Sequence, residues 1–314
     1  MNAATVLLTG ANGFVGPHLV NALIASGRRV HGAALGPPPA SPALAGWHAA
    51  DIRDPESLVA AVESARPDAI VHLAGQSSAA VSFDDPAETF RVNALGTWNL
   101  LEAVRKAAPR ARVIVVGSAE SYGPQPEGTR VDESAPFRPV SPYGLSKAAA
   151  DAFADIAGRT HGIDVVRTRS FAHAGPGQTP RFALPSFAQQ IAAIEAGRAE
   201  PVLRVGNLDV TRDITDVRDV AAAYVALIER GAAGVAYNVC SGRSLRLSDV
   251  TGQLVQRARV PIRIDVDRAR FRPADVPYLV GDPSAIRRDC GWQATTSVGR
   301  ILDDLLADWR GRTE

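Results

Sequence analysis

A short apolar strand that leads directly into a glycine-rich turn constrains this chain more than any other feature. Residues Thr5–Thr9 read as a fully buried strand, and a helical pattern follows over about Pro17–Ser26. Between them lie Gly10, Gly13 and Gly16, with the spacing G-x-x-G-x-x-G. Small residues in such a turn let backbone N–H groups and the start of the helix approach a pyrophosphate. The pattern therefore predicts a nucleotide-binding strand, turn and helix at the start of the fold.

Strand and helix patterns then alternate over about 170 residues, with no repeat at shorter period. Further strands are expected at Arg29–Leu35, at a short segment ending near Ala49–Asp51, at Asp68–Gly75, Arg112–Gly117 and Asp164–Arg169, and a helical pattern covers about Pro86–Ala107. This alternation predicts an α/β fold with a doubly wound parallel sheet. We expect a nucleotide-binding domain over 1–170, onto which about 210–235 packs back. A smaller C-terminal α+β lobe over 171–314 is expected to close over it and leave a cleft.

The ends of the second, third and fourth strands bear on nucleotide binding. NAD enzymes usually place an acidic residue after the second strand to bond the ribose 2′-OH, and NADP enzymes often place an arginine there. Here Leu35 is followed by glycine and a proline run, so this position leaves NAD and NADP open. Asp51 could accept from an adenine amino group, although Asp54 nearby reads equally as a helix N-cap. We interpret His72 as a packed strand-end histidine rather than a catalyst.

Ser118, Tyr143 and Lys147 are the candidate catalytic residues. Tyr143 and Lys147 are four residues apart in a helical segment, so they share one face. A tyrosine has a reference pKa of about 10; a nearby ammonium favours the phenolate and lowers that pKa, which permits acid–base catalysis. Ser118 follows the fifth strand, at the edge where open parallel sheets bind ligands, and could hold a substrate oxygen beside Tyr143. The Tyr-x-x-x-Lys spacing also occurs by chance on protein surfaces. It indicates catalysis only together with the nucleotide site that precedes it in the chain.

Composition argues against several other classes of protein. The chain has 314 residues and a net charge of +1 with interspersed charges, which gives no electrostatic case for nucleic acid or a membrane surface as a partner. No apolar run approaches the roughly 20 residues of a membrane helix, and no basic region precedes the apolar run at Val6, so we expect no signal peptide. Cys240 and Cys290 lie far apart and near no histidine cluster, which favours buried free thiols, no metal site and a cytoplasmic location.

Taken together, these motifs resemble those of the extended short-chain dehydrogenase/reductases in both order and spacing. The matching segments are Thr9-Gly10-x-x-Gly13-Phe14-x-Gly16, Asp51-Ile52, His72-Leu-Ala-Gly75, Asn93, Ser118 and Tyr143-x-x-x-Lys147. The resemblance implies a Rossmann-like sheet and NAD or NADP as cofactor. It also implies that Tyr143 is the acid/base, that Lys147 holds the nicotinamide ribose and lowers the Tyr143 pKa, and that Ser118 orients the substrate oxygen. The implied cofactor contacts are Gly10, Asn12, Gly13, Phe14, Val15, Gly16, Asp51, Ile52, Leu73, Ala74, Gly75, Asn93, Tyr143, Lys147 and His173.

Two motifs in the second lobe resemble the GDP-sugar branch of this family, which contains GDP-mannose 4,6-dehydratases and 4-keto reductases. They are Val205-Gly206-Asn207-Leu208-Asp209-x-x-Arg212-Asp213-x-x-Asp216 and Phe271-Arg272-Pro273-x-Asp275-Val276-Pro277. Arg212 and Arg272 suit a diphosphate because a guanidinium makes planar, bidentate contacts. The resemblance implies a GDP-linked hexose as substrate, and a homodimer through the helices that carry Asn93 and Tyr143. The implied substrate contacts are Ser118, Glu120, Tyr143, Gln178, Asn207, Arg212, Arg272 and Asp275.

The same residues leave the reaction open. Dehydratases of this branch carry a Glu two residues after the Ser or Thr to remove the C5 proton, and Glu120 occupies that position, but the reductases resemble the same segment. The run Thr168–Gln178 is closer to the reductase pattern, which favours reduction of the 4-keto group of GDP-4-keto-6-deoxy-mannose or a close relative with NAD(P)H. Dehydration through Glu120 and 4-epimerisation stay as alternatives. Ala172 stands where the family commonly has Asn, so one hydrogen bond near the substrate is missing or replaced.

Overall fold

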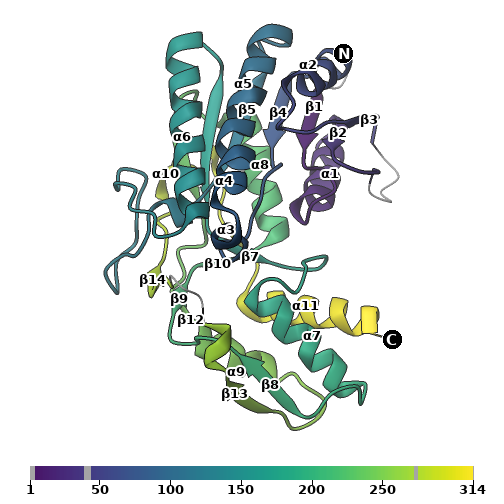
Figure 1. Cartoon of the computed structure of the whole chain (residues 1–314), viewed down its shortest axis with the longest axis vertical. Helices are drawn as coiled ribbons and strands as arrows, with labels where there is room; N and C mark the ends of the chain where they lie inside the picture. The colour runs from purple at the N-terminus through teal and green to yellow at the C-terminus, as the bar shows by residue number, and fades with distance from the viewer. Residues whose placement is uncertain (1–3, 39–43, 272–274, 314) are drawn as a thin grey trace.

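A parallel sheet forms the centre of the molecule in the computed structural model, which describes residues 4–38, 44–271 and 275–313 (Figure 1). In spatial order its strands are β11 (Ala236–Val239), β6 (Val165–Ser170), β5 (Arg112–Ser118), β4 (Ala69–His72), β1 (Thr5–Thr9), β2 (Arg29–Ala34) and β3 (Gly46–Ala49). Each neighbouring pair is parallel. The doubly wound sheet predicted from the sequence is confirmed.

The first strand shows why these apolar runs form the sheet. Side chains alternate between the two faces of a strand. Val6 and Leu8 accordingly belong to the core on one face, and Leu7 belongs to the core on the other. All three are almost completely buried. A continuous apolar run is therefore what a strand covered on both sides requires.

Helices supply that cover on both faces. One face carries α1 (Val15–Ala25), α8 (Val217–Arg230) and α10 (Ser284–Cys290); the other carries α2 (Pro55–Ala65), α5 (Gly96–Ala107) and α6 (Pro142–His161). The helical pattern expected over Pro86–Ala107 consists of α4 (Pro86–Phe90), a π-helical turn over Arg91–Leu95, and α5. The short helix α3 (Val81–Asp84) precedes them.

After β6 the chain leaves the central sheet for the second lobe, and it later returns to the sheet. β6 ends at Ser170, and segments of the second lobe follow before α8 packs against α1. β11 then pairs with β6, with Asn238 opposite Arg169. α10 comes later still and packs against α8 and β11. The layer around the sheet is thus built from stretches that are far apart in the sequence.

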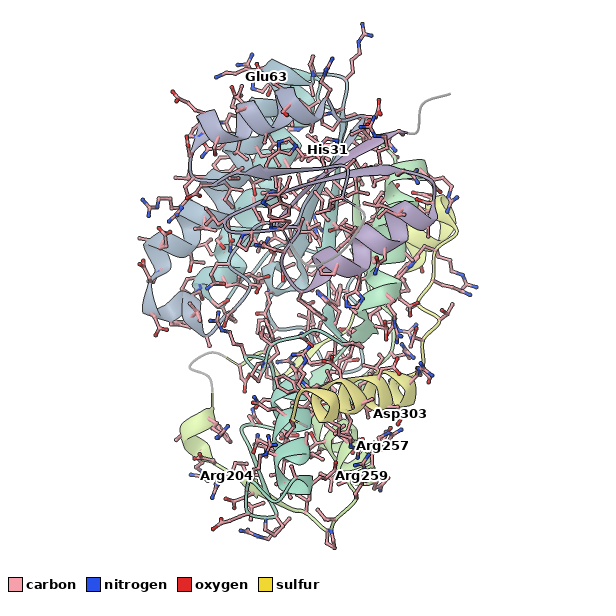
Figure 2. The ribbon with its side chains drawn as sticks, turned by 90° about the vertical axis from the view of Figure 1, so that its right-hand side faces the viewer. His31, Glu63, Arg204, Arg257, Arg259 and Asp303 are labelled. Carbon is pink, nitrogen blue, oxygen red and sulfur yellow. The ribbon has the colours of Figure 1, made fainter. Side chains whose placement is uncertain are left out.

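The second lobe lies beyond the sheet and has its own apolar core (Figure 1). Its main elements are α7 (Ala183–Glu195), α9 (Leu247–Val255), α11 (Val298–Thr313) and the parallel strands β8 (Val202–Val205) and β13 (Arg263–Val266). Phe187, Leu203 and Leu305 are among its buried residues. At its surface Arg257 pairs with Asp303 of α11 at 2.7 Å (Figure 2).

Several short strands join the two lobes. β7 (Ala172–Ala174) pairs with β10 (Ile214–Asp216), and β9 (Thr211–Arg212) lies between β12 (Leu245–Arg246) and β14 (Tyr278–Leu279). Two 3₁₀ turns, Ala119–Ser121 and Arg268–Arg270, adjoin the same region. Strands of two or three residues have no sequence periodicity of their own, so the sequence predicted only a mixture of short elements here.

Buried charges fix the segment that follows β5. Asp151 of α6 accepts hydrogen bonds from Arg167 Nη1 at 2.9 Å and from Arg169 Nε at 3.2 Å. Arg169 Nη1 also donates to the Tyr122 hydroxyl at 2.9 Å, and that hydroxyl donates to Asn238 Oδ1 at 2.7 Å. Buried charges are tolerated only with such partners. The network holds the turn after β5 between α6 and β11.

Candidate active site

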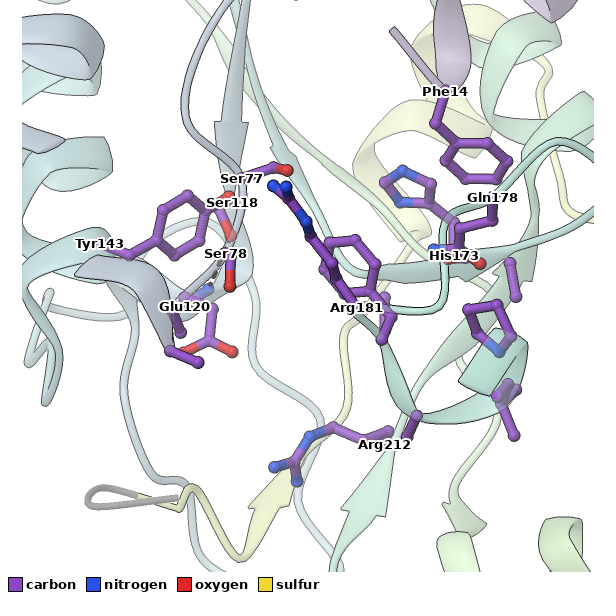
Figure 3. A pocket seen from close by; sticks show the side chains of 18 of the residues that line it. Phe14, Ser77, Ser78, Ser118, Glu120, Tyr143, His173, Gln178, Arg181 and Arg212 are labelled. Atoms are coloured by element: carbon purple, nitrogen blue, oxygen red, sulfur yellow. Dashed lines mark hydrogen bonds between the residues drawn. The ribbon is translucent and has the colours of Figure 1, made fainter. Parts of the chain in front are cut away.

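The ends of the parallel strands face the second lobe across a cavity of about 880 Å³ (Figure 3). The turn after β1, the segments after β4 and β5, the start of α6 and β7 line one side, and the start of α7 with β9 lines the other. A smaller cavity of about 370 Å³ lies at the ends of β1, β2 and β3 and shares the glycine-rich turn. Ligands of open parallel sheets bind at this edge.

Most residues predicted from the sequence line these two cavities. The larger one is lined by Gly10, Gly13, Phe14, Val15, Leu73, Gly75, Ser118, Glu120, Tyr143, Lys147, His173, Gln178, Asn207, Arg212 and Asp275. The smaller one is lined by Gly10, Asn12, Gly13, Asp51, Ile52, Leu73, Ala74 and Gly75. Arg272 lies outside the described residues.

The glycine-rich turn has the close packing that its sequence predicts. Gly10 has φ +68°, and a Cβ there would lie 2.7 Å from Ala74 N, so a side chain would push the turn away from the end of β4. A Cβ on Gly16 would collide with the Ala11 carbonyl, which gives Gly16 a packing role outside both cavities. α1 begins at Val15, which lines the larger cavity, and no side chain caps its start, as at helix ends that bind phosphate.

Ser118, Tyr143 and Lys147 come together at the inner end of the larger cavity. Ser118 is the last residue of β5, and its hydroxyl accepts from Glu120 N at 3.2 Å. Tyr143 lies in the first turn of α6, whose start is capped by Ser141, the acceptor for Gly144 N at 3.0 Å. The Ser118 hydroxyl hydrogen bonds with Tyr143. These contacts place the Ser118 and Tyr143 hydroxyls side by side, so that both can hydrogen bond to one carbonyl oxygen.

Burial controls the protonation of this group. It raises the pKa of Tyr143 to about 12, with the Ser118 hydrogen bond acting the other way and the charge of Glu120 adding to the rise. Burial lowers the pKa of Lys147 to about 8. Lys147 Nζ donates to Val116 O at 2.9 Å. Burial therefore outweighs the predicted lowering of the Tyr143 pKa by Lys147 in this structure, and Tyr143 is protonated at neutral pH.

Two further predictions from the sequence concern Asn93 and His72. Asn93 lines neither cavity: its Oδ1 accepts from Gln76 N at 2.8 Å, and its Nδ2 donates to Gln76 O and to Ser146 Oγ. Asn93 thus bridges the segment after β4 and α6, and its predicted contact with the cofactor stays a prediction. His72 bonds to Thr9 Oγ1 at 2.7 Å and to Thr97 Oγ1 at 3.2 Å. Burial lowers its pKa to about 3, so it is neutral and packed, as its position predicts.

The wall opposite Tyr143 consists of aromatic and amide side chains. The rings of Phe14 and His173 stack with centroids 5.9 Å apart, and His173 Nδ1 donates to Phe171 O at 3.0 Å. Burial lowers the His173 pKa, so its other nitrogen is available as an acceptor. Gln178 is buried, and its Nε2 donates to His173 O at 3.1 Å (Figure 3).

In the second lobe, Asp275 joins two of the predicted substrate residues. Asn207 Nδ2 donates to Asp275 Oδ2 at 2.9 Å, and Arg212 Nη2 lies 3.8 Å from Asp275 Oδ1. Arg212 also donates to Thr211 O. Figure 3 shows the Arg212 guanidinium extending into the space below Glu120. These polar groups lie across the cavity from the candidate catalytic residues.

Three residues that face the cavity were missed in the sequence. Ser77 and Ser78 follow β4 and lie beside Ser118, and their place after a parallel strand could have indicated them (Figure 3). Arg181 precedes α7, and its guanidinium points across the cavity toward Ser77 and Ser118 (Figure 3). It makes no hydrogen bond or ion pair with any of the residues that the structure describes. No motif or periodicity marks Arg181, because it comes from an irregular loop.

Comparison with known proteins gives matches over almost the whole chain. The family model described as GDP-mannose 4,6 dehydratase matches residues 7–305. A protein of Pseudomonas aeruginosa, GDP-6-deoxy-D-mannose reductase, is 36% identical over 98% of this chain and 97% of its own length.

Two solved structures are similar to the whole chain. RMD from Pseudomonas aeruginosa, complexed with NADPH, has a TM-score of 0.87 and 34% identity, covering 99% of this chain and 100% of that one. UDP-glucose 4-epimerase from Thermus thermophilus, complexed with NAD, has a TM-score of 0.88 and 29% identity, covering 98% of this chain and 99% of that one. Both relatives were solved with a nicotinamide cofactor bound.

The low pKa of Lys147 can be measured directly, because the chain contains only two lysines, Lys106 and Lys147. We expect NMR of protein labelled with ¹³C-lysine to show one side-chain signal that titrates near pH 8, where burial places the Lys147 pKa. Lys106→Arg should leave that signal in place and so assign it. A Lys147 signal without titration below about pH 10 would contradict the effect of burial.

Proposed function

Because this chain belongs to the family described as GDP-mannose 4,6 dehydratase, we propose that it reduces the 4-keto group of a GDP-linked 4-keto-6-deoxyhexose with NADH or NADPH. The observation that carries this proposal is the protonated Tyr143 beside Ser118 at the inner end of the cavity. Reduction of a ketone needs an acid at the carbonyl oxygen, and the Tyr143 hydroxyl, which is protonated at neutral pH, can supply that proton.

The proposed mechanism divides the work between three side chains. The hydroxyls of Ser118 and Tyr143 hold the carbonyl oxygen at C4 of the sugar. When bound, the reduced nicotinamide supplies a hydride to that carbon. As the carbonyl oxygen gains negative charge, it takes the Tyr143 proton, and the C4 hydroxyl forms. The Lys147 ammonium stabilises the phenolate that Tyr143 becomes, because an opposite charge in a buried site interacts strongly.

Residues of the two cavities are proposed to hold the cofactor. The N–H groups at the start of α1 and the turn with Gly10 and Gly13 would receive its diphosphate. The smaller cavity, with Asp51 and Ile52, would receive the adenosine. His173 would accept from the carboxamide of the nicotinamide, since its Nδ1 is already used as a donor.

The nucleotide part of the substrate is proposed to lie toward the second lobe. Arg212, with Asn207 and Asp275, would contact the diphosphate and ribose, as a guanidinium suits planar oxygen groups. Arg181 projects between these residues and Ser118, so we propose that it bonds the diphosphate or a sugar oxygen next to it (Figure 3). Gln178 would contact the sugar from the opposite wall.

A specific observation keeps dehydration as a second candidate. Glu120 lines the larger cavity, and its charge acts on Tyr143, so a carboxylate lies within electrostatic reach of the acid. In that position it could remove the proton from C5 of a 4-keto sugar, as in the dehydratases of this family. Epimerisation at C4 would use the same Ser118, Tyr143 and Lys147, and the Thermus relative is such an epimerase.

We also propose a homodimer and a cytoplasmic location. Leu145 and Ile156 of α6 are 54% and 39% exposed and share one helix face, about three turns apart. Trp98 of α5 packs against Phe153 of α6 beside them. A second copy of the chain would cover this apolar face.

Cys240 and Cys290 are free thiols, which fits a reducing compartment, and cell fractionation would test the location. In the described residues, no helix is long and apolar enough for a membrane span.

The three candidate reactions can be separated with purified protein. We expect GDP-4-keto-6-deoxy-mannose to cause oxidation of NADH or NADPH, and Tyr143→Phe to lower the rate by roughly 10²–10⁴-fold while cofactor binding persists. No oxidation at high enzyme concentration would contradict the reductase. If GDP-mannose alone gave a 4-keto product without net cofactor change, and Glu120→Gln removed it, the dehydratase would be supported. Stronger competition by UDP than by GDP would point to an epimerase.

Replacement of Arg181 tests its substrate contact. We expect Arg181→Met to raise the KM for the nucleotide sugar about 10- to 100-fold, since hydrogen bonds to charged groups contribute about 1.5–3 kcal/mol. The KM for NAD(P)H and the melting temperature should stay the same, and Arg181→Lys should restore part of the loss. Arg204 also lines the cavity but pairs with Glu200 at 3.5 Å, so Arg204→Met is the matched control. Equal effects of both changes would contradict a specific role for Arg181.

The proposed dimer face can be tested by the mass of the protein in solution. We expect light scattering to give the mass of a dimer for the wild type and of a monomer, at low concentration, for Ile156→Glu. Gln253→Glu introduces the same charge on α9 in the second lobe and should stay dimeric. A wild-type monomer, or a dimer that Ile156→Glu leaves intact, would show that this face is not the interface.

A further inference from the structure

The smaller cavity has a lining that distinguishes between the two forms of the nicotinamide cofactor. It lies at the ends of β1, β2 and β3, which is the position of the adenosine in folds of this kind. Most of its walls are glycine, alanine and aliphatic side chains. Among the described residues that line it, two are ionisable, Asp51 and Arg53. Any charge that the cavity offers to a ligand must come from these two side chains or from the ends of the strands.

Arg53 is fully engaged with carboxylates. Its Nε donates to Asp51 Oδ1 at 2.9 Å and to Oδ2 at 3.0 Å, and its Nη1 donates to Glu88 Oε1 at 2.8 Å. The hydrogen bond from Arg53 lowers the Asp51 pKa, and those to Asp51 and Glu88 raise the Arg53 pKa, so Asp51 and Arg53 are both charged at neutral pH. Glu88 also pairs with Arg91 through its other oxygen, so the two carboxylates and two guanidiniums on this side of the cavity balance one another. An incoming phosphate would have to compete with both carboxylates for Arg53.

The end of β2 offers hydrogen-bond acceptors. Asn12 lines the cavity, and its Nδ2 donates to Leu35 O at 2.8 Å. This contact uses one of the two N–H groups of Nδ2 and fixes the orientation of the amide, which leaves Oδ1 as an acceptor. An acceptor suits a ribose hydroxyl, which can donate to it, and repels a phosphate, which cannot.

The sequence around β2 supplies no cation either. Between Arg29 and Asp51 the chain contains no lysine or arginine, and its only ionisable side chains there are His31 and His48. Those two histidines bond to each other at 3.1 Å, and burial lowers the pKa of both, so they are neutral at neutral pH. Neither lines the cavity. Leu35, which does, is 61% exposed at its mouth.

We infer that this chain binds NAD(H) in preference to NADP(H). The 2′-phosphate of NADP carries close to two negative charges at neutral pH, and a partly desolvated charge is costly without an opposite charge or donors. At the end of β2 it would meet Leu35, the acceptor end of Asn12 and an arginine already held by Asp51 and Glu88. The 2′-hydroxyl of NAD would instead donate to Asn12 Oδ1. The preference is a property of these side chains rather than of the fold, because a relative of 34% identity was solved with NADPH.

This inference rests on the use of a nicotinamide cofactor but not on the identity of the sugar. A binding measurement therefore tests it separately from the proposed reaction. We expect calorimetric titration of the purified protein to give a dissociation constant for NAD⁺ at least about tenfold lower than that for NADP⁺, the equivalent of one lost charge-assisted contact. Equal affinities, or tighter binding of NADP⁺, would overturn the inference.

Two substitutions at Leu35 test whether the missing cation is the cause. Because Leu35 is exposed at the mouth of the cavity, Leu35→Arg places a guanidinium there without burying it. We expect it to tighten NADP⁺ binding about tenfold or more and to change NAD⁺ binding little. Leu35→Gln has a similar reach without the charge and should leave the preference as it was. An equal gain for both variants, or a gain for neither, would show that charge at this position does not set the preference.

A third variant examines Arg53 as the alternative phosphate ligand. Arg53→Met should alter the affinities for NAD⁺ and NADP⁺ by similar factors, because in this structure Arg53 acts through Asp51. If Arg53→Met weakened NADP⁺ binding alone, Arg53 would be the ligand of the 2′-phosphate and the inference would be wrong. The melting temperature without ligand, measured for every variant, separates loss of binding from loss of folding.

Discussion

All neighbouring strands of the central sheet run in the same direction, and this constraint decides where everything else can lie. Parallel strands must be connected by crossovers, so helices cover both faces and the carboxyl ends of the strands gather at one edge. The glycine-rich turn after β1, Ser118 at the end of β5 and His173 in the segment after β6 reach the same cavity for that reason. The second lobe only has to close over that edge to complete a site for an extended ligand.

Chemistry at that edge depends on desolvation. Tyr143 and Lys147 are both buried, and burial favours the neutral form of each: it raises one pKa and lowers the other. A neutral tyrosine can donate its proton. It is therefore better suited to protonate a carbonyl oxygen than to remove a proton from an alcohol. The buried pair of Asp151 and Arg169 shows the contrasting solution, in which two charges are kept because each satisfies the other.

The sequence predicted the strands and the glycine-rich turn well, and it predicted that Ser118, Tyr143 and Lys147 come together, because each of these features rests on a local pattern. Residues Thr5–Thr9 and Ser118 are examples: an apolar run bounded by glycine is a strand wherever it lies. What it did not predict depends on contacts between distant segments. Asn93 turned out to bond Gln76 and Ser146 rather than face a cavity, and the Tyr143 pKa is set by burial that no spacing reveals. Arg181 belongs to an irregular loop, so its place in the cavity follows only from how the lobes pack.

The return of the chain to its own sheet has a consequence for how the protein is made. β11 is an edge strand of the sheet, and α10 packs against it, yet β11 is encoded after α7 and β8 of the second lobe, and α10 after α9 and β13. During synthesis the nucleotide-binding part cannot be completed until about residue 290 has left the ribosome, because α10 ends there. The face of α1 that meets α8 stays uncovered until α8 has been made, which requires the chain up to Arg230. The two lobes must therefore mature together, and neither can be trimmed away to leave the other intact.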